Sequence, residues 1–374
     1  MTNTSSLDRL VRFRRDLHQI PELDRELPKT LRYIDLVLSG LNCLVFSPTR
    51  SSICAYFDFG NKKTAAFRSD MDALPISERT FLPFTSLHEG RMHACGHDGH
   101  MAMLLELAVR ADSLTQIPPC NLLLIFQPAE ETRGGAKDIC LSGIFEKYNV
   151  SHIFGFHLWP GLPEGEVYTK SGPMLARSSE LDVDIYGKSS HIARPSEGLD
   201  ALYAQTLFIK SAYDMEKSEL PPSELRLLRF GKAESGTVRN AISAKSSLLG
   251  SMRAFSDETF DYMKKRLAEI AADTQRLTGC DINIRLSEGY PPVINDGKLY
   301  DAVCSFLGPN APHALKEPFM IAEDFSFYGK YVPSLFFFLG AGDRPSLHSR
   351  DFNFNEEILL RGADFYTRLL GFEF

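Results

Sequence analysis

Residues 91–101 read R-M-H-A-C-G-H-D-G-H-M and constrain the chain more than any other stretch. They place three histidines, one cysteine and one aspartate within eleven residues, with glycines at positions 96 and 99. Imidazole and thiolate groups are the ligands that zinc and its neighbours commonly take. The alternative is a glycine-rich turn with a few exposed histidines and one buried free cysteine. This stretch alone leaves both interpretations open, and the rest of the chain has to decide between them.

Composition excludes several classes of protein. The chain has 374 residues, enough for more than one domain, because single cores stop growing near ~250–300 residues. A net charge of −7 argues against a nucleic-acid footprint, which would be basic. No apolar run approaches the roughly 18 residues of a membrane span, and the first residues lack the apolar segment of a signal peptide. We expect a cytoplasmic globular protein without nucleic-acid or membrane partners.

The seven cysteines are scattered and form no C-x-x-C pair. Most stand in apolar surroundings, where a free cysteine acts as a small hydrophobic residue in a reducing compartment. Cys95 is the exception, because it lies within the histidine-rich stretch. The other six, predicted to fill the core, are Cys43, Cys54, Cys120, Cys140, Cys280 and Cys304.

Apolar strands run into polar side chains at three places. A strand at 64–68 leads into Asp70 and Asp72, and the continuous apolar run 122–126 leads into Q-P-A-E-E. Such runs are typical of buried strands in parallel sheets, where sites form at the carboxyl ends. A third strand, at 151–155, is expected to end just before His157. The other elements expected in this half are helices at 5–18, 29–41 and 100–110, the last with Asp98 as N-cap, and a strand at 52–57.

The pattern changes near residue 177. Residues 181–186 alternate apolar and polar side chains, which is typical of a half-exposed antiparallel strand. Elements predicted next give the order β-α-β-β-α-β of a ferredoxin-like module. We therefore expect a domain at 177–286 inserted into a discontinuous α/β domain at 1–176 and 287–374. The remaining expected elements are helices at 199–215, 257–278 and 356–370 and strands at 225–231, 246–253, 281–286 and 334–339.

Five candidate metal ligands fall on loops that follow strands of the α/β domain. Each has an ordinary explanation on its own: a structural histidine, a surface-loop residue, or, for Glu131, a charge opening a helix near Gly134. Five such coincidences are less plausible than one shared site. Because five ligands exceed what one tetrahedral ion with an open position needs, we favour two ions that share a ligand. The five are Cys95, His97, Glu131, His157 and His348.

Glu130 stands directly beside Glu131. Of two adjacent carboxylates on a loop, one can face the metal and the other the water that the metal holds. A metal lowers the pKa of that water toward about 7, and a free carboxylate can take its proton and pass it to a leaving amine. The alternative for Glu130 is an exposed acid, which the apolar run before it makes less attractive.

Assembled in order, these stretches resemble the M20 metallopeptidase family, and most closely its aminoacylase-like amidohydrolase branch. That branch includes hippurate hydrolases, auxin-conjugate hydrolases and N-acetyldiaminopimelate deacetylases. The matching motifs span nearly the whole chain. They are R-R-D-L-H-Q-I-P-E-L (14–23), R-S-D-M-D-A-L-P-I (68–76), M-H-A-C-G-H-D-G-H-M (92–101), F-Q-P-A-E-E (126–131), G-F-H-L-W-P (155–160), G-K-S-S-H-I-A-R-P (187–195), A-E-D-F-S (322–326) and L-H-S (347–349).

The resemblance implies two divalent ions per subunit, with zinc, manganese, cobalt and nickel as alternatives. Cys95 would bridge the ions, His97 and His157 would complete one site, and Glu131 and His348 the other. It also implies roles outside the ligand set. Glu130 would be general base and acid, and Asp72, with Asp70, would orient the ligands.

The same resemblance makes the insertion a lid and dimerisation domain, so that a homodimer is expected. His191 would stabilise the oxyanion, from its own or the partner subunit, and Asn240 and Arg253 would hold polar groups of the substrate. Arg253 is suited to a bidentate clamp on a carboxylate. The chain departs from the family pattern away from the ligands, at Asp24, Ile192, Arg194 and Ile321.

The resemblance implies a metal-dependent amidohydrolase that cleaves N-acyl-L-amino acids, with N-acetyl, benzoyl and indolyl-acyl substrates and N-acetyldiaminopimelate all open. The fold class expected is α/β, a di-metal exopeptidase-like domain with an inserted ferredoxin-like α+β domain. Three alternatives remain. They are a dipeptidase or carboxypeptidase of the same family, a cysteine hydrolase with Cys95 as nucleophile, and a non-catalytic protein that clamps a ligand. The H-A-C-G-H-D form favours the amidohydrolase.

Overall fold

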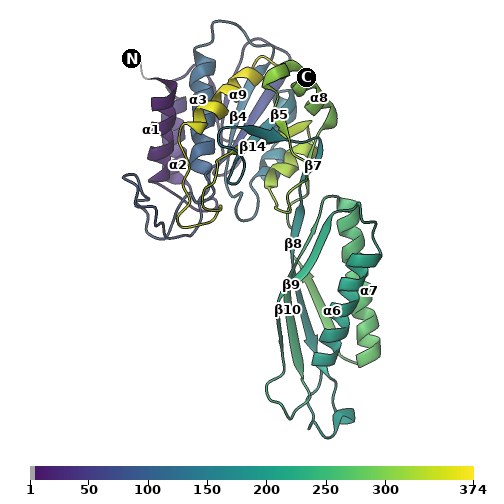
Figure 1. The fold of residues 1–374 in the computed structure, drawn as a ribbon. Helices are drawn as coiled ribbons and strands as arrows, with labels where there is room; N and C mark the ends of the chain where they lie inside the picture. The colour runs from purple at the N-terminus through teal and green to yellow at the C-terminus, as the bar shows by residue number, and fades with distance from the viewer. Residues whose placement is uncertain (1–4) are drawn as a thin grey trace. The chain divides into compact units, whose positions relative to one another are not determined.

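The computed structural model describes residues 5–374, which form two compact units (Figure 1). The predicted insertion, 177–286, lies within the second unit. Among the described residues, no helix is both long and apolar enough to span a bilayer. The first unit runs up to Met174 and takes in Ile294–Glu317 and Asp324–Phe374, and the second comprises Leu175–Val293 and Pro318–Glu323.

The first unit is built on an eight-stranded mixed sheet in the order β1-β2-β4-β3-β5-β14-β6-β13. Its centre is parallel, since β3 pairs in parallel with β4 and β5, and β5 with β14. Every residue of β3, β4 and β14 is buried, which explains their continuous apolar runs. The strands are β1 (Leu44–Phe46), β2 (Ile53–Phe57), β3 (Thr64–Asp70), β4 (Asn121–Gln127), β5 (Val150–Trp159), β6 (Val167–Thr169), β13 (His313–Ala314) and β14 (Ser334–Gly340).

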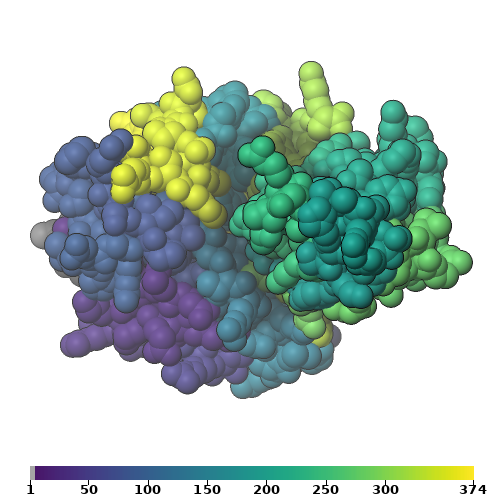
Figure 2. Space-filling view, turned by 90° about the horizontal axis from the view of Figure 1, so that it is seen from below, coloured from purple at the N-terminus to yellow at the C-terminus, as the bar shows by residue number. Residues whose placement is uncertain are grey.

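Helices pack on both faces of this sheet. Neighbouring residues of β14 point to opposite faces: the Phe337 ring lies 5.1 Å from Phe365 of α9, and the Phe336 ring lies 4.9 Å from Phe325 of η3. Helices α1, α3 and α9 also contact one another. Figure 2 shows C-terminal residues (yellow) lying directly against residues from the first third of the chain (blue). The helices are α1 (Ser6–His18), α2 (Pro28–Leu38), α3 (His97–Asp112), α4 (Ala136–Leu141), α5 (Ile144–Lys147), α8 (Gly297–Leu307), α9 (Ile358–Leu369) and the 3₁₀ helices η2 (Gly308–Asn310) and η3 (Asp324–Lys330).

The second unit has its own antiparallel sheet in the order β11-β8-β10-β9, with α6 and α7 side by side on one face (Figure 1). This is the predicted ferredoxin-like arrangement. The alternation in β8 buries Leu181, Val183 and Ile185 in a separate core with Phe208 and Phe260. The elements are β8 (Arg177–Tyr186), η1 (Pro195–Glu197), α6 (Ala201–Ser218), β9 (Arg226–Ser235), β10 (Lys245–Ala254), α7 (Asp257–Thr278) and β11 (Asp281–Leu286), with a two-stranded sheet of β7 (Gly172–Leu175) and β12 (Val293–Asn295) beside them in the chain.

Two local predictions were wrong. Asp98 is not the N-cap of α3, because the helix begins at His97 after Gly96, whose φ of 83° lies in the left-handed region. Asp98 instead lies buried in the first turn and accepts side-chain hydrogen bonds. His157 does not follow its strand but lies within it, since β5 continues through Leu158 to Trp159.

Candidate metal centre

The histidine-rich stretch forms a tight turn into α3 that depends on its two glycines. Gly96 supplies the positive φ that turns the chain into the helix. A Cβ atom on Gly99 would lie 2.9 Å from Leu158 Cδ1 and 2.9 Å from Phe354 Cζ. The helix start can therefore press against β5, which brings Cys95 and His97 beside the ligand of that strand.

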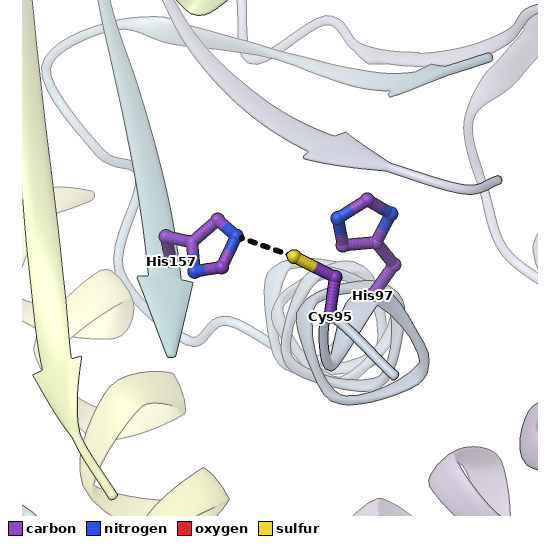
Figure 3. Close-up of side chains that lie close together, drawn as sticks. All are labelled: Cys95, His97 and His157. Carbon is purple, nitrogen blue, oxygen red and sulfur yellow. Dashed lines mark hydrogen bonds between the residues drawn. The ribbon is translucent and has the colours of Figure 1, made fainter. Parts of the chain in front are cut away.

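Cys95, His97 and His157 form the first group, and their ligand atoms all lie within 4.8 Å of one another (Figure 3). The Cys95 Sγ atom is 3.3 Å from His157 Nε2. Each imidazole donates its Nδ1–H to a backbone carbonyl 2.7 Å away, that of Asp72 for His97 and that of Leu158 for His157. The Nε2 atoms therefore keep their lone pairs for the group, as in metal sites where an outer partner fixes the tautomer.

Cys95, Glu131 and His348 form a second group within the same limit. His348 Nε2 lies 3.3 Å from Glu131 Oε1, and the backbone N–H of His348 donates to the carbonyl of Ala94 at 2.9 Å. His348 has a φ of 63°, which turns this loop back toward the Cys95 turn. The two groups have Cys95 in common, so that five residues make two groups of three, as the hypothesis of two ions with one shared ligand predicts.

Asp72 holds the glutamate pair in place. Its carboxylate accepts the backbone N–H groups of Glu130 at 2.9 Å and Glu131 at 3.0 Å. Glu130 is 8% exposed, and one of its carboxylate oxygens lies within 4.8 Å of ligand atoms of His97 and Glu131. Glu130 thus lies against the two groups without belonging to either of them.

The donor set fits divalent cations. Burial, together with Glu131 and Glu130, raises the pKa of the Cys95 thiol well above its ordinary value. Burial also raises the pKa of Asp72 and lowers those of His97 and His157, which keeps both imidazoles neutral. His97 Nε2 is buried without a hydrogen-bond partner among residues 5–374. Bound cations would satisfy this nitrogen and offset the clustered acids.

A third group, of Asp70, His97 and His100, is close enough for a metal but is already hydrogen-bonded. His100 Nε2 accepts the backbone N–H of Leu158 at 2.9 Å, and its Nδ1–H donates to Asp70 at 2.7 Å. Both nitrogens of His100 are therefore engaged. Asp70 also accepts from Arg68 at 2.8 Å, so this trio supports the site rather than holding an ion.

His191, the candidate for stabilising the oxyanion, and the substrate-binding candidates Asn240 and Arg253 all lie in the second unit. His191 and Asn240 are on neighbouring loops, where the Asn240 carbonyl accepts the N–H of Ile192 at 3.0 Å. Asn240 precedes the start of β10, and Arg253 stands near the end of that ten-residue strand. Arg253 donates to the carbonyl of Met320 in the same unit. The structure therefore brings His191 and Asn240 together but leaves Arg253 at the opposite end of β10.

Sequence reasoning missed several buried groups around the centre. His100, Arg68, Arg14 and His18 are at most 2% exposed, yet none of them was among the candidate site residues. Charged and imidazole groups on an amphipathic helix usually face solvent, so spacing alone does not mark them. The sequence held one local sign of a shared contact: Arg14 and His18 stand four residues apart and therefore lie on the same face of the helix.

Comparison with known proteins identifies the family of the chain. The profile of Peptidase family M20/M25/M40 matches residues 66–371. A hydrolase of Staphylococcus epidermidis is 34% identical over 367 residues, covering 96% of each chain. A crystal structure of a protein from methicillin-resistant Staphylococcus aureus matches with a TM-score of 0.91 at 30% identity, covering 98% of this chain and 97% of that one. The YXEP protein of Bacillus subtilis, described as a dinuclear metal binding peptidase, matches with a TM-score of 0.84 at 27% identity over 98% of each chain.

The chain belongs to Peptidase family M20/M25/M40. It is a metal-dependent hydrolase that acts on amide bonds, as the family and the hydrolase relatives establish. The predicted family and fold class are confirmed.

Proposed function

We propose that the protein is a di-metal amidohydrolase that cleaves N-acyl-L-amino acids to a carboxylic acid and a free amino acid. One observation carries the proposal: Cys95 belongs to two overlapping ligand groups, with the buried Glu130 beside them. The description of the similar YXEP protein as dinuclear supports two ions rather than one. N-acetyl and benzoyl groups are the acyl groups proposed, with N-acetyldiaminopimelate as one candidate substrate.

Each residue of the centre has a proposed role. Cys95, His97 and His157 would hold one ion, and Cys95, Glu131 and His348 the other. Zinc, manganese, cobalt or nickel bound there would supply Lewis acidity, which polarises an amide carbonyl and acidifies water. Glu130 takes the proton of the attacking water and delivers it to the departing amine nitrogen. Asp72 keeps Glu130 in reach by binding its backbone N–H, and Asp70 supports the imidazoles.

The second unit is proposed as the lid that contacts substrate and forms a homodimer. His191 would donate a hydrogen bond to the developing oxyanion, from its own or the partner subunit, and Asn240 and Arg253 would bind polar groups of the amino acid. Exposed apolar side chains at the start of α6, Leu202 and Tyr203, are consistent with a surface that pairs with a second copy. Asn240 lies before the start of β10 and Arg253 near its end, so the two residues would bind different parts of a substrate or act in different subunits.

Alternative chemistries have less support. A nucleophilic cysteine needs a lowered pKa, whereas burial and two carboxylates raise the pKa of Cys95. A non-catalytic binding protein has no need of a buried Glu130 beside the ligand groups. A dipeptidase or carboxypeptidase of the same family would use the same centre, and only the substrate distinguishes it.

The decisive experiment is a substrate panel. The protein is stripped with a chelator and reloaded with zinc, manganese, cobalt or nickel, and each form is assayed with N-acetyl-, N-benzoyl- and indolyl-acyl-amino acids and with dipeptides. We expect chelation to abolish hydrolysis and metal to restore it, with N-acyl-amino acids preferred. Activity that survives chelation would point to the cysteine hydrolase. A preference for dipeptides would point to the peptidase.

A further inference from the structure

Arg14 lies buried in the second half of α1 and uses three of its nitrogens on three different partners. Its Nε atom donates to Asp98 at 3.0 Å, Nη1 to Glu356 at 3.1 Å and Nη2 to Asn353 at 2.7 Å. The guanidinium stands 4.3 Å from the ring centroid of Phe354. A planar, stacked guanidinium fixes the directions of its donors, which a lysine ammonium does not.

These partners belong to two of the three chain segments that deliver ligands from outside the β-strands, the third being the loop of Glu131 after β4. Asp98 directly follows His97, in the first turn of α3. Asn353 stands five residues after His348, and the backbone of His348 is tied to Ala94 in the Cys95 turn. One guanidinium therefore connects the turn that carries Cys95 and His97 to the loop that carries His348.

The surroundings support a positional role for Arg14. The side chain of His348 is 51% exposed, so packing alone does little to hold it. Phe352, in the same loop, lies against the turn, since a Cβ atom on Gly96 would be 3.5 Å from its ring. Arg14 itself lies outside residues 66–371, which the family profile matches, and nothing in that match assigns it a role.

We propose that Arg14 is a positioning residue for the metal centre: it sets the His348 loop against the Cys95–His97 turn and so preorganises the group of Cys95, Glu131 and His348. This inference rests on the proposed function, because it presumes that the group binds an ion. Loss of the connection would let His348 move away from Glu131 while the group of Cys95, His97 and His157 keeps its shape. One of the two ions should then bind more weakly than the other.

The test is Arg14→Lys, with cobalt or zinc titrated into chelated protein by calorimetry and by the absorption of the cobalt–thiolate band. We expect the affinity for one ion to fall roughly 10–100-fold, the range found when an outer partner of a ligand is lost, while the other ion binds nearly as before. Arg15→Lys is the matched control. Arg15 also pairs with Glu356, at 2.6 Å, but its side chain is 44% exposed and contacts neither Asp98 nor Asn353 among the described residues.

A second variant guards against a folding defect in Arg14→Lys. Asn353→Ala leaves the hydrogen bonds of Arg14 to Asp98 and Glu356 intact and removes only the Arg14 contact nearest to His348 in the chain, so it should weaken binding of the same ion. If both variants bind two ions with wild-type affinity, Arg14 serves only the packing of α1, even if the melting temperatures fall. If the wild-type protein itself fails to bind two ions, the proposed function is overturned together with this inference.

Discussion

Asp72 Oδ2 lies 3.0 Å from the backbone nitrogen of Glu131, while the backbone oxygen of Asp72 lies 2.7 Å from Nδ1 of His97. A single residue in the loop just after β3 thus orients one member of each ligand group. Asp72 is buried and, among the described residues, belongs to none of the groups that could hold a metal, so it supports the ligands rather than adding a sixth.

Replacing Asp72 with alanine should weaken metal binding and activity together. The variant keeps the backbone bond to His97 but leaves the N–H groups of Glu130 and Glu131 without their acceptor. We expect a loss of roughly 10–100-fold in affinity for an ion, measured by calorimetric titration. Asp35→Ala, on the exposed face of α2, is the control and should bind both ions normally.

Glu130→Gln should separate chemistry from metal binding. The amide has the same shape as the carboxylate but cannot take a proton, so turnover should fall about 10²–10⁴-fold. Metal content, measured by atomic absorption, should stay at the wild-type level, whereas Glu131→Gln should lose metal. Substantial activity in Glu130→Gln would show that another group moves the proton.

Cys95→Ala should lose both ions, because the thiol belongs to both groups. His157→Ala, which removes a member of one group only, should retain one ion of the two. Metal-to-protein ratios after dialysis against limiting free metal distinguish these outcomes. Cys43→Ala, at a half-buried cysteine outside both groups, should keep the wild-type ratio. Equal losses in the Cys95 and His157 variants would contradict the shared ligand.

His18 should make stability depend on pH above neutrality. Burial alone would lower its pKa, but the Asp98 carboxylate and hydrogen bonds to Asp98 and Glu78 raise the pKa from 6.5 to about 9. Because the folded-state pKa exceeds the unfolded one, the stabilisation is complete below pH 6.5 and is lost as the pH rises through 9. A shift of this size corresponds to roughly 3 kcal/mol.

Urea unfolding of the wild type and of His18→Gln between pH 6 and pH 10 measures this effect. The difference in the free energy of unfolding should be largest at pH 6 and should shrink through the alkaline range. His313→Gln, at an exposed histidine paired with Glu166, should show a difference that is small at every pH. A difference that stays constant across this range would mean that the pKa of His18 is the same in the folded and the unfolded protein.

Gly99→Ala should destabilise the protein although alanine favours helices. The added Cβ would lie 2.9 Å from both Leu158 Cδ1 and Phe354 Cζ, whose side chains are buried. Overpacking of this kind costs typically about 1–3 kcal/mol, which exceeds the helix propensity gained. Thermal unfolding of both variants measures the effect. Gly231→Ala, where a Cβ would have no heavy atom within 4 Å, should leave the stability nearly unchanged.

The sequence predicted most helices and strands because their apolar periodicity and buried runs are local properties. The order of the sheet was not predictable in this way. β4 lies between β2 and β3, although 50 residues separate its start at Asn121 from the end of β3 and 63 separate it from the end of β2, so the order depends on packing between distant parts of the chain. Strand ends likewise led to the ligand candidates that the structure brings together, since parallel strands deliver their ends to one edge.

Other parts of the site depended on contacts that local patterns do not reveal. Aspartate is a common N-cap, but the Asp98 carboxylate accepts hydrogen bonds from Arg14 and His18, and the left-handed Gly96 is the N-cap of the helix. His157 was expected to follow the end of its strand. Its apolar neighbours continue the strand past it, so that His157 lies within β5. The supporting role of His100 depends on its hydrogen bonds to Asp70 and to the backbone N–H of Leu158, which lie far from it in the chain and could not be predicted from local patterns.

The position of β2 has a consequence for how the chain can be shortened. β2 pairs antiparallel with β4 from Ile53 to Phe57, and these residues precede the segment that the family profile matches. A fragment that starts at residue 66 would keep every proposed ligand but would lose β2. It would therefore expose one edge of β4, a strand whose residues are all buried in the intact protein. The unpaired edge of an apolar strand can pair with strands of other molecules, so such a fragment should aggregate.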